Sequence, residues 1–218
     1  MAARDTINKV EPPALPVAPQ SSGLRDHLDV LNNVLRLFFN RLANNVNLLT
    51  GEYGGRFVEK PNAVFYSTVD QTAASTGTAY ALQFGNTYLG EAISITGTPK
   101  TRITPTYSGV YNFQVSAELF SNSASSKVVD LWIRRSGVDI GNTAKEHILS
   151  GSGGIDDFNY NFNIDVSAGQ YIEMMWATND TDAIINYQAA SSPRPAIPST
   201  VVTVTFVSAL PETLPTPP

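Results

Sequence analysis

Residues 111–119 read Tyr-Asn-Phe-Gln-Val-Ser-Ala-Glu-Leu, and this stretch decides the fold class of the chain. Its apolar and polar residues alternate one by one, so Tyr111 and Phe113 fall on one face of an extended strand and Glu118 falls on the other. Residues 158–166 repeat the pattern as Phe-Asn-Tyr-Asn-Phe-Asn-Ile-Asp-Val. The alternation therefore predicts two half-buried β-strands.

Other segments between residues 56 and 209 have the composition of short strands, and turn-forming pairs such as Ser108-Gly109 and Ser136-Gly137 separate them. Because no helical pattern lies between these segments, residues 56–209 are expected to form a mainly β domain, an antiparallel sandwich or jelly roll, and parallel βαβ architectures are excluded. The expected strands lie near residues 63–69, 78–84, 92–95, 102–104, 128–135, 147–149, 171–177, 183–187 and 201–207.

Residues 21–51 carry the spacing of a helix instead, with Ser22 suited to cap its start and Gly51 suited to end it. Apolar residues recur at alternating steps of four and three, which is the heptad pattern of a helix that supercoils with partner helices. We expect three such helices to form the stalk of a homotrimer; a helix packed on the chain's own β-domain is the alternative. The expected seam consists of Leu24, Leu28, Leu31, Leu35, Phe38, Leu42, Asn45 and Leu49.

The two ends of the sequence are rich in proline, which disfavours helix. Residues 1–20 are expected to form an extended arm, in which Val10, Leu15 and Val17 are small apolar anchors for docking on another surface. A disordered tail is the alternative for this arm. Residues 210–218 are expected to form a second extended segment, to which no function is assigned.

Composition excludes several classes of function. With 14 Lys+Arg against 19 Asp+Glu and a formal net charge of -5, the chain lacks the basic footprint of a nucleic-acid-binding protein. It contains no cysteine, so disulfides, thiol nucleophiles and cysteine-ligated metals are excluded. No apolar run is suited to a secretory signal or to membrane insertion.

The sequence predicts no catalytic, cofactor-binding or metal site and no enzymatic activity. His27 and His147 lie far apart in the sequence, and no base and nucleophile can be paired by spacing. The acidic pairs Asp156-Asp157 and Asp180/Asp182 have oxygen ligands of the kind that calcium prefers, but solvated turns are the simpler interpretation. A depolymerase that uses Asp156, Asp157 or Glu118 is retained as a minor alternative.

Two of the expected strands have apolar residues on both faces, around Trp132 and between Tyr171 and Trp176. One face of each sheet in a monomeric sandwich usually meets water, so a subunit interface would explain the second apolar face. The residues expected in the jelly-roll core or the trimer interface are Tyr111, Phe113, Trp132, Tyr171 and Trp176.

Four phrases between residues 63 and 208 resemble the tumour-necrosis-factor and C1q class of jelly rolls, in the version found on fibres and decorations of tailed bacteriophages. A fifth phrase, in the predicted helix, resembles the one that precedes the jelly roll in such phage proteins. The departures are Gln170 and Ser136, which replace the usual Asp and Asn at turns. The matching phrases are Gly109-Val110-Tyr111-Asn112-Phe113, Trp132-Ile133-Arg134-Arg135-Ser136-Gly137-Val138, Ala168-Gly169-Gln170-Tyr171-Ile172-Glu173-Met174-Met175-Trp176, Pro195-Ala196-Ile197-Pro198-Ser199-Thr200 and Leu31-Asn32-Asn33-Val34-Leu35-Arg36-Leu37-Phe38-Phe39-Asn40.

This resemblance implies a homotrimeric jelly roll preceded by a coiled-coil-like helix, located in the virion. The expected function is that of a non-enzymatic fibre or decoration protein, whose N-terminal arm binds other virion proteins. The alternative is a receptor-binding adhesin that contacts a host glycan or protein through distal loops such as Tyr187 and residues 151–154. No cofactor, nucleic acid or membrane insertion is expected.

Overall fold

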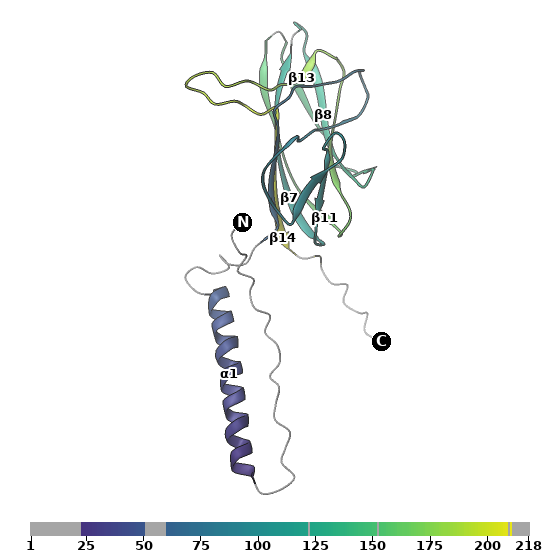
Figure 1. The fold of residues 1–218 in the computed structure, drawn as a ribbon. Helices are drawn as coiled ribbons and strands as arrows, with labels where there is room; N and C mark the ends of the chain where they lie inside the picture. The colour runs from purple at the N-terminus through teal and green to yellow at the C-terminus, as the bar shows by residue number, and fades with distance from the viewer. Residues whose placement is uncertain (1–22, 51–59, 122, 152, 209, 211–218) are drawn as a thin grey trace, which may run out of the picture. The chain divides into compact units, whose positions relative to one another are not determined.

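The protein divides into two units, Met1–Glu59 and Lys60–Pro218, and each is described by itself. The computed structural model describes residues 23–50, 60–121, 123–151, 153–208 and 210 (Figure 1). The extended segments predicted at residues 1–20 and 210–218, with the anchors Val10, Leu15 and Val17, lie outside the described residues except for Leu210.

In residues 23–50, the described part of the first unit, the chain forms one helix, α1 (Leu24–Thr50), of 27 residues. At ~1.5 Å per residue it is about 40 Å long. Asp26 lies in the first turn, where a carboxylate interacts favourably with the helix dipole, and the His27 N–H donates to the Gly23 carbonyl over 2.9 Å. The helix predicted from the heptad spacing is therefore present.

The second unit consists of short strands. They are β1 (Asn62–Ser67), β2 (Gln71–Thr72), β3 (Tyr80–Ala81), β4 (Asn86–Glu91), β5 (Ile93–Thr96), β6 (Arg102–Pro105), β7 (Gly109–Ser121), β8 (Lys127–Arg135), β9 (Val138–Asp139), β10 (Lys145–Leu149), β11 (Ile155–Val166), β12 (Ile172–Thr178), β13 (Ala183–Ile185) and β14 (Thr200–Ser208).

These strands form two antiparallel sheets. The first has the order β2-β13-β7-β14-β1-β4, with β11 along the other side of β7, and the second has the order β10-β8-β12-β6-β5. In the second sheet, β3 also pairs with β12, and β9 pairs with β8. Figure 1 shows β7, β11 and β14 running along the length of the β-unit.

The pairings of the eight principal strands are nested, and this order identifies the fold. In chain order, these strands are β1, β6, β7, β8, β10, β11, β12 and β14. The first pairs with the last (β1–β14), the second with the second last (β6–β12), and the pairs β7–β11 and β8–β10 lie inside these. A chain that folds back along itself and wraps into two sheets gives this nesting, which is the jelly roll. The predicted fold class, a mainly β antiparallel jelly-roll sandwich preceded by one helix, is confirmed.

The inner faces of the two sheets enclose one hydrophobic core. The alternation predicted for residues 111–119 is observed, because the odd-numbered residues of β7 are buried and those between them are partly or fully exposed. Burying each large apolar side chain contributes roughly 1.5–3 kcal/mol. The largest fully buried apolar side chains include Trp176, Tyr111, Phe65, Phe84, Phe113, Phe158, Leu131 and Ile133.

The sequence did not predict β2, β4 or β9, and only Tyr80–Ala81 of the expected strand 78–84 is assigned to a strand, β3. β4 reads Asn-Thr-Tyr-Leu-Gly-Glu, lies at the edge of the first sheet, and has no fully buried side chain. Alternation identifies a strand by its half-buried face, so an edge strand of this kind carries little of that signal.

Candidate functional site

The two histidines lie in different units of the chain. His27 lies on α1, and His147 lies on β10, where its Nε2 is 2.9 Å from Asp156 Oδ2 and its ring packs edge-on against Phe158. His147 therefore joins β10 to β11 at the side of the sandwich. Of the three carboxylates considered for a depolymerase, Asp156 is held by this contact, and Glu118 lies directly opposite Asp157 in the β7–β11 pair.

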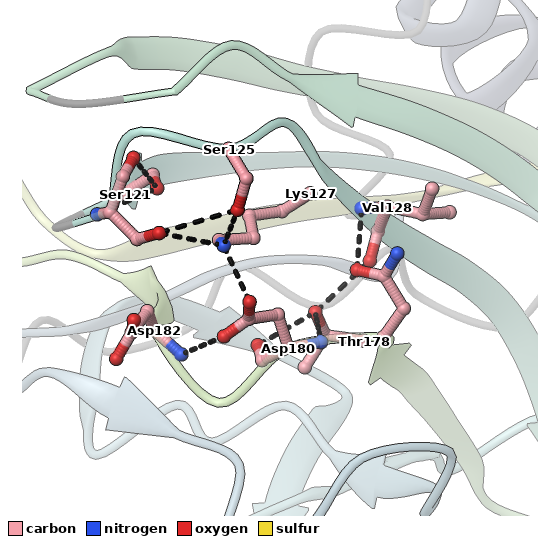
Figure 2. A network of polar contacts seen from close by, with 9 residues as sticks. Ser121, Ser125, Lys127, Val128, Thr178, Asp180 and Asp182 are labelled. Carbon is pink, nitrogen blue, oxygen red and sulfur yellow. Dashed lines mark hydrogen bonds and ion pairs between the residues drawn. The ribbon is translucent and has the colours of Figure 1, made fainter.

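One polar cluster links the loop between β7 and β8 to the turn between β12 and β13 (Figure 2). Lys127 is only 1% exposed, and its Nζ donates to Ser123 Oγ at 2.9 Å, to Ser125 Oγ at 2.6 Å and to Asp180 Oδ2 at 2.5 Å. All three protons of the ammonium group are therefore used. A buried charge is stable only with such partners, so this cluster fixes the two loops together.

The turn at Asp180 is organised around the same cation. Asp180 Oδ1 accepts the Asp182 N–H over 3.0 Å, and the hydrogen bond from Lys127 holds the pKa of the Asp180 carboxyl below its ordinary value. The preceding Asn179 Oδ1 accepts the Val128 N–H over 2.9 Å. In the part of the chain that the structure describes, no group of three or more His, Asp or Glu side chains is arranged to hold a metal ion.

The second apolar face of β12 is covered within the chain. Met175 is 2% exposed and Glu173 is 9% exposed, although both point away from the core-facing Met174. Glu173 Oε1 accepts a hydrogen bond from Thr101 Oγ1 over 2.8 Å, and Ala81 lies opposite Met175 in the β3–β12 pair. The burial of Met175 and Glu173 therefore needs no subunit interface, and an interface at β12 stays a prediction.

The five residues expected in the core or interface divide into two groups. Tyr111, Phe113 and Trp176 belong to the core. Trp132 and Tyr171 are half-buried. Trp132 Nε1 donates to Asp139 Oδ1 over 2.8 Å, and Arg102 Cζ lies 4.6 Å from the centre of the Tyr171 ring. The structure does not bring the five residues together into one site.

Asp139 is the centre of a small ion-pair site beside Trp132. Arg134 donates to it twice, from Nε to Oδ1 over 2.7 Å and from an Nη to Oδ2 over 3.2 Å. These hydrogen bonds, and the one from Trp132, hold the pKa of Asp139 below its ordinary value. The site fixes the β8–β9 turn, where Ser136 and Gly137 have positive φ angles.

A groove of about 660 Å³ is lined by residues 70–72, 79–81, 83, 97–99 and 101–102 together with Trp176. Gln71 closes one side, because its side-chain amide donates to the Gln83 carbonyl over 3.1 Å and accepts the Gln83 N–H over 2.9 Å. On another side of the groove, Thr101 donates a hydrogen bond to Glu173. These polar groups are used within the chain, so the groove identifies no ligand.

The outer face of the first sheet is neutral and polar along much of its length. The Asn112 amide donates to Asn161 Oδ1 at 2.6 Å and to Asn163 Oδ1 at 2.7 Å, across the β7–β11 pair. Gln114 lies opposite Asn161 in the same register. Further along the pair, the amide ladder ends at the two carboxyl groups of Glu118 and Asp157.

The helical seam is not buried in the described part of the first unit. In the seam, Leu28 is 46% exposed. Outside the seam, the exposed fractions of apolar side chains are 52% for Val30, 51% for Leu37, 59% for Phe39 and 45% for Val46. The half-buried seam residues are Leu31, Leu35, Phe38, Leu42 and Asn45. Leu24 and Leu49 lie on the helix, and the structure does not describe their side chains. The described helix is not long and apolar enough to cross a membrane.

Lys127 is the clearest site residue that the sequence interpretation missed. It occupies the same alternating positions as Val129, Leu131 and Ile133, all of which are buried. A lysine in phase with a buried face signals an internal charge that needs a partner. The sequence offered no means of choosing Asp180, because the two residues are far apart along the chain.

No family model and no curated protein matches the sequence. Among solved structures, the chain is similar to the structure of Eiger TNF from S. frugiperda, with 10% sequence identity and a TM-score of 0.47, over 72% of this chain and 98% of that chain. The assignment of the jelly roll rests on the nested strand pairs described above.

Proposed function

We propose that this protein is a non-enzymatic, homotrimeric structural component of a bacteriophage virion, in which the helix forms a stalk and the β-unit is displayed. The observation that carries the trimer is the apolar seam of α1, where Leu28 is 46% exposed and Leu31, Leu35, Phe38 and Leu42 are only half-buried. An apolar helix surface of this extent needs a covering partner, and the heptad spacing suits other copies of the same helix.

The virion role rests on the phrases that resemble phage fibre and decoration proteins. In a trimer, three copies of the arm at residues 1–20 would act together, and their effective concentration would make weak individual contacts into a stable attachment. The proposed partners are therefore other copies of this chain and the virion proteins that receive the arm.

The trimer is tested by light scattering of the full-length chain, whose mass should be three times 23.5 kDa. Leu35→Gln changes a seam position, whereas the matched variant Leu37→Gln makes the same change at an off-seam position that is 51% exposed. We expect the seam variant to dissociate at concentrations at which the control remains trimeric. A monomeric wild-type chain would contradict the proposal and favour a helix that packs on its own β-unit.

Virion attachment is tested separately by deleting residues 1–20 and measuring incorporation into particles. The shortened chain should remain trimeric and be absent from purified particles. Its presence at the wild-type level would show that the arm is not the anchor.

A receptor-binding adhesin is the second candidate, favoured by the hairpin at residues 186–199. This hairpin extends away from the sandwich beyond β13 (Figure 1), and Ala189–Pro193 at its outer part are exposed. Exposed loops on a rigid scaffold are common recognition elements. Binding of the full-length protein to host cells, lost on shortening of this hairpin, would support the adhesin.

A further inference from the structure

The projecting hairpin at residues 186–199 begins and ends on one residue of β7. The Glu118 N–H donates to the Ser199 carbonyl over 3.0 Å, and the Glu118 carbonyl accepts the Asn186 N–H over 2.8 Å. Glu118 lies at the point where the neighbour of β7 changes from β14 to β13. Ala117 pairs with Thr200 of β14, and Leu119 pairs with Ile185 of β13. The base of the hairpin is therefore fixed to the backbone of Glu118.

The Glu118 side chain faces a second carboxyl group. Asp157 is its direct partner in the β7–β11 register, within hydrogen-bonding reach, and Glu118 is half-buried. Side chains directly opposite in an antiparallel pair have Cβ atoms about 4.5–5.5 Å apart, so two ionised carboxylates there repel each other. A single proton between them removes the repulsion and supplies a hydrogen bond.

The opposite charge comes from the hairpin itself. Arg194 attracts the Glu118 carboxylate, and its guanidinium is held in the hairpin by donation to the carbonyls of Pro195 and Ala189, each over 3.1 Å. β13 and β14, the other strands beside this part of β7, contain no charged residue. The adjacent acid on β11, Asp156, is paired with His147.

We propose that Glu118 is a proton-controlled latch at the base of the hairpin. When Glu118 is protonated, it shares its proton with Asp157 and joins β7 to β11. When it is ionised, it is repelled by Asp157 and attracted to Arg194, so its side chain changes partner from the sheet to the hairpin. The proposal concerns the β-unit alone and does not depend on the virion role.

The electrostatics place this change near neutral pH. Burial, followed by the hydrogen bond and repulsion from Asp157, raises the pKa of Glu118 to about 7, and Arg194 opposes the rise. A carboxyl whose pKa is raised by folding stabilises the folded chain most below the ordinary pKa of glutamate. That contribution is lost as the pH rises through about 7.

The test is an NMR titration of the full-length chain between pH 4 and 9, following the Glu118 side chain and the amides of Asn186 and Arg194. In the wild type, all three should report one midpoint near 7. Glu118→Gln imitates the protonated acid, so this midpoint should vanish from the hairpin amides. Asp157→Asn should lower the midpoint by about one pH unit or more, because the like charge is removed.

Asp165→Asn is the matched control, since Asp165 also lies on β11 but contacts Arg135 instead. The Glu118 titration midpoint in the Asp165→Asn variant should equal that of the wild type. If Glu118→Gln does not fold, the shift caused by Asp157→Asn decides the question. Each of three results would overturn the proposal. The first is a Glu118 midpoint between 4 and 5 in the wild type, and the second is an unchanged midpoint in Asp157→Asn. The third is a titration of the hairpin amides that persists in Glu118→Gln.

Discussion

Lys127 Nζ lies 2.5 Å from Asp180 Oδ2, although the two residues are 53 positions apart and only the carboxylate reaches solvent. The lysine side chain is 1% exposed and the aspartate side chain is 35% exposed. The ion pair is therefore asymmetric, and the two ways of breaking it have different consequences.

We expect Asp180→Asn to destabilise the β-unit more than Lys127→Met. In the first variant the ammonium group of Lys127 stays buried without a counter-charge, which costs roughly 3 kcal/mol or more. In the second, the remaining carboxylate can be hydrated and the methionine fills the apolar volume. Urea unfolding of both variants measures the difference; a larger loss in Lys127→Met would mean that the lysine is not the buried partner in solution.

Gly151→Ala should destabilise the β-unit where Gly151 lies against Ala124. A Cβ at this position would lie 2.0 Å from the Ala124 carbonyl oxygen, so the backbone would have to move. We expect a loss of about 2 kcal/mol or more in the free energy of unfolding. Gly141→Ala is the matched control, since a Cβ there meets nothing within 4 Å, and it should have nearly wild-type stability. Equal stability of the two variants would contradict this prediction.

Phe113→Ala should remove a central part of the core. Phe113 is 0% exposed, and truncation of a buried phenylalanine costs about 3–5 kcal/mol through lost burial and the cavity that remains. Tyr88→Ala, at a side chain that is 82% exposed on β4, should change stability by less than about 1 kcal/mol. Denaturant unfolding of both variants gives the comparison, and a stable Phe113→Ala would place the core elsewhere.

Acid should weaken the β8–β9 turn through Asp139. Because Arg134 and Trp132 lower the pKa of this carboxyl in the folded chain, its contribution to stability is complete above the ordinary aspartate pKa. The contribution is lost as the pH falls through the lowered folded-state value. Asp139→Asn should therefore be less stable than the wild type at pH 7, with a smaller difference at pH 2. A constant difference across this range would exclude the linkage.

Much of the fold could be predicted because the deciding strands are half-buried. β7 and β11 alternate cleanly, and the heptad spacing located α1. β4 was missed because an exposed edge strand that contains Gly90 has neither alternation nor strong β propensity. The burial of Met175 within the chain could not be predicted, because coverage of the second face of a strand depends on how loops cross the sheet, which periodicity does not report.

The polar sites could not be predicted in the same way. Glu118 and Asp157 are 39 positions apart by their residue numbers, and only the β7–β11 register makes them neighbours. The alternation fixed their common orientation, outward from the core, but a shift of the register by two residues would have paired Glu118 with Asn159 instead. Charge pairing therefore depends on the register, whereas burial depends mainly on the alternation.

The position of β14 has a consequence for synthesis of the chain. This strand is the last in sequence, yet it lies between β1 and β7 in the interior of the first sheet. Until Thr200–Ser208 leaves the ribosome, both neighbouring strands retain an unpaired row of backbone groups, and the sheet is split. We expect the β-unit to fold only after β14 has been synthesised, and slowly, because its closing contacts join β14 to β1, the first strand of the unit.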